Sequence, residues 1–74
     1  MSLLAGISGR LAVKKLQKVG YVIVRQRGSH VRLRHPNSSI HKPLTIPLHP
    51  ELKIGLLHQA LQDAGIDIKQ FLLL

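Results

Sequence analysis

A histidine and two arginines alternate along residues 30–34, as His30, Arg32 and Arg34. Histidine is the side chain whose ordinary pKa, about 6.5, lets it take up and release a proton near neutral pH. The planar guanidinium of arginine matches two oxygens of a phosphate and keeps its charge. RNA carries its own nucleophile, the 2′-hydroxyl, so its cleavage requires proton transfer and stabilisation of negative charge. The grouping suits RNA cleavage with His30 as general acid or base, although a strand histidine flanked by arginines is more often part of a solvated face.

Groups that flank His30 in the sequence could complete a phosphate site. The preceding glycine and serine can offer backbone amides and a hydroxyl, and nearby basic side chains add positive charge. The residues expected to bind substrate are Gly28, Ser29, Arg25, Arg27, Arg32, Arg34 and Lys53. Ser29, His49 and Lys53 remain alternatives for a second group that shares the proton transfer.

Neither a metal site nor a cofactor is expected. The chain has no cysteine, and its other histidines, His35, His41, His49 and His58, follow no common zinc spacing. No carboxylate precedes Glu51, so the acidic residues of a two-metal nuclease are missing near His30. There is also no glycine-rich phosphate loop. The chemistry predicted for His30 is therefore metal-independent.

The charge of the chain points to a polyanionic partner. The formal net charge is +8, and the three acidic residues all lie after residue 50. A basic surface can simply be solvated, but so uneven a distribution favours nucleic acid. The lack of cysteine favours a reducing compartment such as the cytoplasm, and no apolar run approaches the roughly 18 residues that a membrane span requires.

An amphipathic helix is predicted over residues 9–19. Ser8 is a suitable N-cap, and Gly20 can end the helix in a left-handed conformation. Lysines occupy the opposite, outer face. The apolar stripe consists of Leu11, Ala12, Leu16 and Val19.

Three strands are predicted next, over residues 21–25, 30–35 and 44–48, with a turn at residues 26–29 between the first two. In the second strand Val31 and Leu33 must face the core. His30, Arg32 and Arg34 then share the opposite face, because successive side chains alternate. Basic groups at Arg25, at Arg27 or on the first helix could lie beside them.

A second helix is predicted from Leu52 or Lys53 to Ala64, ended by Gly65. Asp67 can then cap a final helical turn. The predicted fold is α+β, in the order α-β-β-β-α. It consists of a single domain, residues 1–74, with a three-stranded antiparallel sheet and two helices on one face.

Several motifs of the chain resemble the HicA family of toxins. They are the stretch from Gly20 to His30 with its Gly-Ser-His end, Leu33-Arg34-His35-Pro36, Thr45-Ile46-Pro47, Glu51-Leu52-Lys53 and Ala64-Gly65-Ile66. The resemblance covers about residues 7–73. It implies a fold like that of double-stranded RNA-binding domains. It also implies the toxin half of a type II toxin–antitoxin pair, which cleaves mRNA without the ribosome and is neutralised by a HicB-type antitoxin.

The resemblance implies that the histidine of Gly-Ser-His, His30, is the catalytic one. One stretch departs from the family pattern. Where the family often has Lys-Gly-Thr-Leu-Arg, this chain has residues 54–58, with Leu56 and His58 at the Thr and Arg positions. If that arginine contacts RNA in the family, this member is either weaker or uses Arg27 or Arg32 instead.

Two other functions fit the residues. A module with this fold could bind RNA through its shape and phosphates without cleaving it, and would then form no product. A protein with a basic surface could instead dock an acidic partner and bind no nucleic acid. For the toxin, we expect an acidic antitoxin to cover the face that carries His30.

Overall fold

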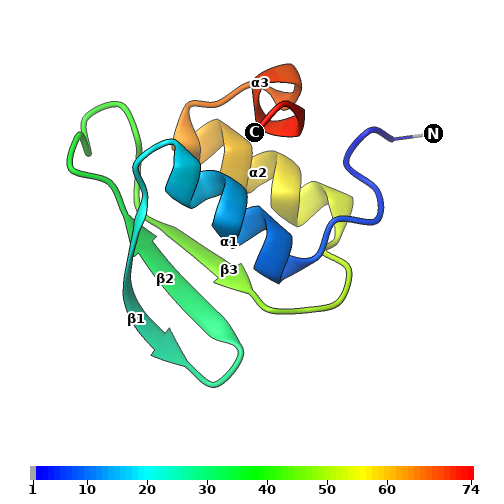
Figure 1. The fold of residues 1–74 in the computed structure, drawn as a ribbon, viewed down its shortest axis with the longest axis horizontal. Helices are drawn as coiled ribbons and strands as arrows, with labels where there is room; N and C mark the ends of the chain where they lie inside the picture. The colour runs from blue at the N-terminus through cyan, green and yellow to red at the C-terminus, as the bar shows by residue number, and fades with distance from the viewer. Residues whose placement is uncertain (1) are drawn as a thin grey trace.

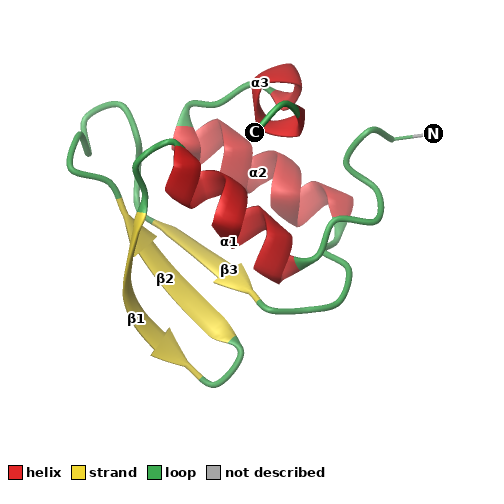
Figure 2. Ribbon diagram, viewed as in Figure 1, coloured by secondary structure: helices red, strands yellow, loops and turns green. Residues whose placement is uncertain are grey.

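Six helices and strands follow one another along residues 2–74, the part of the chain that this computed structural model describes. They are α1 (Gly9–Lys18), β1 (Val22–Arg27), β2 (His30–Arg34), β3 (Leu44–Pro47), α2 (Ile54–Ala64) and α3 (Ile68–Leu72). The strands form one antiparallel sheet in the order β1-β2-β3. The predicted α+β order is confirmed, with α3 as the final helical turn (Figures 1 and 2).

The predicted capping residues lie at the helix ends, although α1 ends at Lys18 rather than at residue 19 and α2 begins at Ile54 rather than at Leu52 or Lys53. Ser8 Oγ accepts a hydrogen bond from the Leu11 amide at 3.0 Å. Asp67 Oδ1 accepts one from the Gln70 amide at 2.7 Å. Gly65 ends α2 with a φ of 68°, a left-handed conformation that glycine adopts at little cost. These ends were predictable because each cap is a contact between near neighbours in the chain.

The first hairpin is tighter than the sequence analysis predicted. β1 extends to Arg27, which pairs with His30, so the turn between the strands is Gly28-Ser29 alone. Gly28 has a φ of 54°, as two-residue hairpin turns often require. The prediction that β1 ends at Arg25 is wrong, because pairing across the hairpin continues for two more residues.

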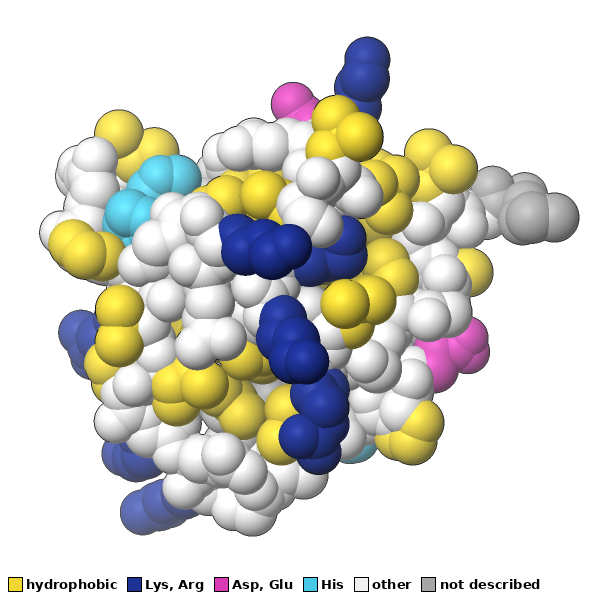
Figure 3. Space-filling model, viewed as in Figure 1, with side chains coloured by type: hydrophobic (Ala, Val, Ile, Leu, Met, Phe, Trp, Pro, Cys, Tyr) yellow, Lys and Arg dark blue, Asp and Glu magenta, His cyan; other side chains and the backbone are white. Residues whose placement is uncertain are grey.

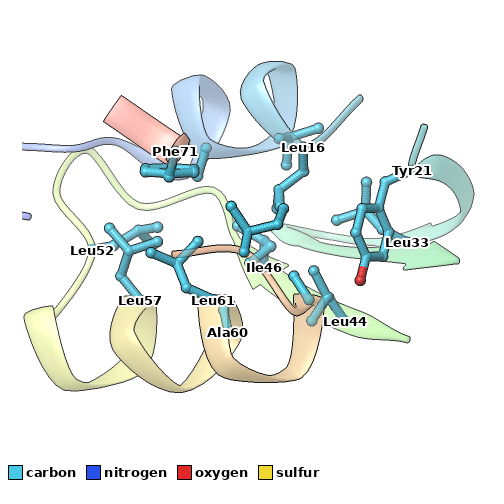
Figure 4. Packing of buried hydrophobic residues seen from close by; sticks show 14 of the residues in the cluster. Leu16, Tyr21, Leu33, Leu44, Ile46, Leu52, Leu57, Ala60, Leu61 and Phe71 are labelled. Atoms are coloured by element: carbon cyan, nitrogen blue, oxygen red, sulfur yellow. The ribbon is translucent and has the colours of Figure 1, made fainter. Parts of the chain in front are cut away.

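The core lies between the sheet and the helices, where β3 contacts both α1 and α2. Figure 4 shows its side chains converging from both layers, with Ile46 of β3 near the middle of the group. The largest fully buried side chains are Phe71, Leu4, Leu16, Leu33, Ile46, Leu52, Leu57 and Val31. With so few aromatic residues, the core is made mainly of leucine, isoleucine and valine.

The helix α1 faces the core with a slightly different side from the one predicted. Leu11 is 43% exposed, and Val13 is buried in addition to Ala12 and Leu16. The helix is therefore turned so that Leu11 lies on its outer face with the lysines. Spacing alone could not choose between Leu11 and Val13, because both border the same apolar stripe.

The strand β1 lies largely outside the cover of the helices. Its six residues are all exposed, and its main contacts are with β2 (Figure 1). Val22, Ile23 and Val24 are about half exposed. The β1–β2 hairpin therefore extends from the body of the molecule and leaves its surfaces open.

No helix within residues 2–74 has the length and apolar character to cross a membrane.

The start of α1 packs tightly against the end of β3. The backbone at Gly9 lies so close to the Pro47 carbonyl oxygen and to Leu48 Cα that a Cβ at residue 9 would overlap both. Gly9 N also donates to the His49 carbonyl oxygen at 2.9 Å. A residue larger than glycine would force the helix away from the sheet.

We expect Gly9→Ala to lower the free energy of unfolding by about 1–3 kcal/mol, the usual range for overpacking. Helix propensity alone predicts the opposite sign, a gain of about 0.5–1 kcal/mol. Gly55→Ala in α2 is the matched control, because a Cβ there meets nothing within 4 Å. Urea unfolding of both variants measures the difference, and a Gly9→Ala protein as stable as the parent would contradict this packing.

Candidate functional site

The alternation predicted for β2 is present in the structure. Val31 and Leu33 are buried, whereas His30 and Arg34 are exposed and Arg32 is half-buried. The histidine and both arginines therefore lie on the face of the sheet that points away from the core, called here the outer face.

A β-bulge adds two more arginines to the outer face. Ile23 pairs with Leu33, but the next pair is Arg25 with Arg32, so Val24 is an extra residue in β1. In a regular strand Arg25 would lie on the same face as Ile23, which is the inner one. The extra residue shifts the alternation by one, and cross-strand partners share a face. Arg25 and Arg27 consequently lie beside Arg32 and His30.

Side chains of all three strands surround a shallow pocket on the outer face. It has a volume of about 330 Å³ and is lined by Val24, Arg25, Arg32, Arg34 and Thr45. Arg32 donates to Thr45 Oγ1 at 3.0 Å, which fixes one guanidinium against β3. Three cationic groups thus converge on one hollow that is open to solvent. Thr45 was not among the predicted site residues, although its place between the core residues Leu44 and Ile46 indicates an outward side chain.

The imidazole of His30 lies at the end of the outer face next to the hairpin turn. It is exposed, and its residue pairs with Arg27 on one side and Pro47 on the other. Within residues 2–74 no side chain or backbone group forms a hydrogen bond with its ring. Both ring nitrogens are therefore open to a ligand. Gly28 and Ser29, the adjoining turn residues, are also exposed.

Lys53, also predicted to bind substrate, does not belong to the outer face. It is the N-cap residue of α2 and lines a separate shallow pocket with Ala5, Glu51, Leu52 and Ile54. The sheet and its hairpin turn thus bring together every other predicted site residue. The loop after β3 instead places Lys53 at the start of α2. Sequence order alone gave no signal of this separation.

Two other histidines have structural contacts. The ring of His35 donates from Nε2 to the Val19 carbonyl oxygen at 2.8 Å and accepts at Nδ1 from the Asn37 amide at 2.9 Å. His41 bonds through Nδ1 to the Ala64 carbonyl oxygen at the end of α2. These bonds tie loops to helix ends. His49 and His58 are exposed.

Tyr21 packs beside these two histidine rings, with ring centroids 5.2 Å from His35 and 6.1 Å from His41. Its hydroxyl donates to the Lys42 carbonyl oxygen at 2.8 Å. Burial raises the pKa of Tyr21 above its ordinary value of 10.0, and the charge of Asp63 raises it further. The hydroxyl therefore stays protonated and keeps this bond, at the opposite end of β2 from His30.

Carboxylates do not gather at the outer face. Among residues 2–74, no three histidine or acidic side chains come together in a group that could hold a metal ion. What the outer face offers chemically is one free imidazole and several guanidiniums. This set suits proton transfer beside a bound phosphate.

A comparison with models of known families decides which family these features belong to. The model of the HicA toxin of bacterial toxin–antitoxin pairs matches residues 9–66. The chain belongs to the HicA toxin family. The match includes α1, the whole sheet and α2, and so all the predicted site residues of this HicA-family chain. No curated protein matches the chain.

Proposed function

We propose that this HicA-family toxin is an endoribonuclease that cleaves mRNA without a metal ion, with His30 as its general acid or base. The observation that carries the proposal is the position of His30. Its free imidazole lies on the same open face as Arg25, Arg27, Arg32 and Arg34, beside a pocket that suits a phosphate. These arginines and the turn residues Gly28 and Ser29 are proposed to hold the RNA backbone.

The proposed reaction is attack of a 2′-oxygen on the adjacent phosphorus. His30 accepts the proton of the 2′-hydroxyl as the new bond to phosphorus forms. Guanidiniums stabilise the charge that develops on the phosphate oxygens, where bidentate contacts are strongest. The bond from phosphorus to the 5′-oxygen then breaks, and that oxygen takes a proton from the imidazolium or from water. The products are a 2′,3′-cyclic phosphate and a 5′-hydroxyl.

We also propose that a HicB-type antitoxin restrains the enzyme by covering the outer face. A toxin of a toxin–antitoxin pair needs such a partner. The outer face is strongly cationic, so an acidic surface would match it and associate rapidly. Coverage of the arginines would keep RNA from reaching His30.

In the decisive experiment, the purified protein is incubated with a 5′-labelled RNA in the presence of a chelator. We expect RNA products with cyclic phosphate ends, whereas DNA of the same sequence should be bound but not cut, because it lacks the 2′-hydroxyl. Cleavage of the DNA, or a requirement for a divalent cation, would contradict the mechanism. Salt-sensitive RNA binding without any product would instead identify a binding module.

A further inference from the structure

A row of basic side chains runs along the outside of α1, separate from the outer face of the sheet. Arg10, Lys14 and Lys18 are exposed and follow one another at intervals of four residues. This spacing places them on one side of the helix, about 6 Å apart along its axis. Figure 3 shows Lys and Arg side chains in such a row over α1. We call these three residues the α1 ridge.

No acidic side chain within residues 2–74 forms an ion pair with the α1 ridge. Like charges four residues apart destabilise a helix, and Arg10 lies at the N-terminal end, where the helix dipole disfavours a cation. The first turn holds no acidic residue, and the three acidic residues of the chain lie after α1. Repulsion along the ridge and the position of Arg10 thus oppose helix stability, whereas the dipole favours Lys18 in the last turn. The ridge has no acidic partner among residues 2–74, which suggests an external anion.

Lys15, on the same helix, has a structural role that the ridge residues lack. Its ammonium donates to the carbonyl oxygens of Phe71, Leu72 and Leu74, at 3.0–3.4 Å, and so ties α1 to the end of the chain. Within residues 2–74 the ridge side chains form no hydrogen bond of this kind. The ridge is therefore not needed to hold the fold together.

The ridge begins at the end of the sheet where His30 lies. His30 pairs with Pro47, and the Pro47 carbonyl is in close contact with Gly9, the residue before Arg10. The outer face and the α1 ridge belong to opposite layers of a thin molecule, whose shortest extent is 18 Å. Arg10, the first residue of the ridge, therefore lies toward the end of the sheet that carries His30, whereas Lys18 lies toward the opposite end, where α1 leads into β1.

We infer that the α1 ridge is a second phosphate-binding surface, which holds the RNA strand next to the cleaved bond. This inference rests on the proposed function. A strand bound on both surfaces must turn around the end of the sheet at His30. A flexible single strand can make that turn, whereas a stiff double helix cannot. The preferred substrate is then single-stranded RNA that extends several nucleotides beyond the cleavage site.

The test compares two double variants that change the net charge equally, Lys14→Gln/Lys18→Gln in the ridge and Lys42→Gln/Lys69→Gln on other exposed surfaces. Each is combined with His30→Ala so that the RNA is not cleaved during the measurement. The RNA is a labelled single strand of about 20 nucleotides. Binding is measured over a range of salt concentrations. For two lost phosphate contacts, the slope of log K against log salt should become shallower by about 1.4 in the ridge variant alone.

Cleavage provides a second readout, with His30 intact. For the long RNA, the ridge variant should have a raised KM and an unchanged kcat. A dinucleotide cannot reach the ridge, so parent and variant should cleave it equally. The glutamines keep the helix propensity of α1. The repulsion that they remove offsets the favourable dipole interaction of Lys18 that they lose, so the variant is expected to melt close to the parent.

The outcomes separate the two proposals. Equal changes of the salt slope in both double variants would mean that only net charge matters and would overturn the inference. So would a ridge variant that binds and cleaves the long RNA like the parent, although the proposed function would then stand. If the parent neither binds nor cleaves RNA, the proposed function fails first.

Discussion

Replacement of His30 by alanine is expected to lower the rate of RNA cleavage by about 10²–10⁴-fold, the usual contribution of a general acid or base. The side chain is exposed and has no hydrogen bond within the described residues, so its loss should leave the fold intact. The Arg25, Arg27, Arg32 and Arg34 side chains remain in place. RNA binding should therefore persist while product formation disappears.

The measurement is a single-turnover cleavage assay with binding followed in parallel. His58→Ala is the matched control, because this histidine is also exposed but lies on α2, and it should cleave RNA like the parent. Thermal melting of both variants checks the fold. An unchanged rate for His30→Ala would show that another group transfers the proton.

Replacement of Phe71 by alanine is expected to have the largest effect on stability. Phe71 is fully buried, and it is the one phenylalanine of a chain that has a single tyrosine, Tyr21, and no tryptophan. Loss of a buried phenylalanine costs about 3–5 kcal/mol. A domain of this length has a total stability of only about 4–11 kcal/mol, at roughly 0.05–0.15 kcal/mol per residue. The variant should therefore melt some tens of degrees lower or show no cooperative transition.

The control for Phe71→Ala is Leu73→Ala, two residues away, where the side chain is 78% exposed. Its unfolding free energy should change by less than about 0.5 kcal/mol. Differential scanning calorimetry distinguishes the two. Both residues lie beyond the span that matches the HicA family model, so the pair also tests whether the last turn is part of the folded unit. Equal stability of the two variants would show that α3 is not docked on the core.

Local patterns were enough to predict the central part of the site. Val31 and Leu33 had to be buried, and strand geometry then placed His30, Arg32 and Arg34 outside. The caps at Ser8 and Asp67 were equally predictable, as were the α-β-β-β-α order and the face that carries the histidine. All of these depend on residues a few positions apart, whose relation is set by backbone geometry.

Other parts of the site depend on contacts between distant segments. The bulge at Val24 is a property of the pairing between two strands, and it decides that Arg25 and Arg27 face the same way as His30. The separation of Lys53 from this face depends on the path of the loop after β3.

The surroundings of α1 show the same division. Its basic outer side follows from helical periodicity in the sequence. Only the tertiary structure shows that Leu11 is exposed and that Lys15 donates hydrogen bonds to the end of the chain. It also shows that the close approach of Gly9 to Pro47 brings Arg10 to the His30 end of the sheet. The sequence by itself determined which residues can do chemistry, and it placed His30, Arg32 and Arg34 on one face of their strand, because that follows from the 2-residue period of a regular strand. The packing of the elements decided which of these faces meet, because that depends on contacts between residues far apart in the chain.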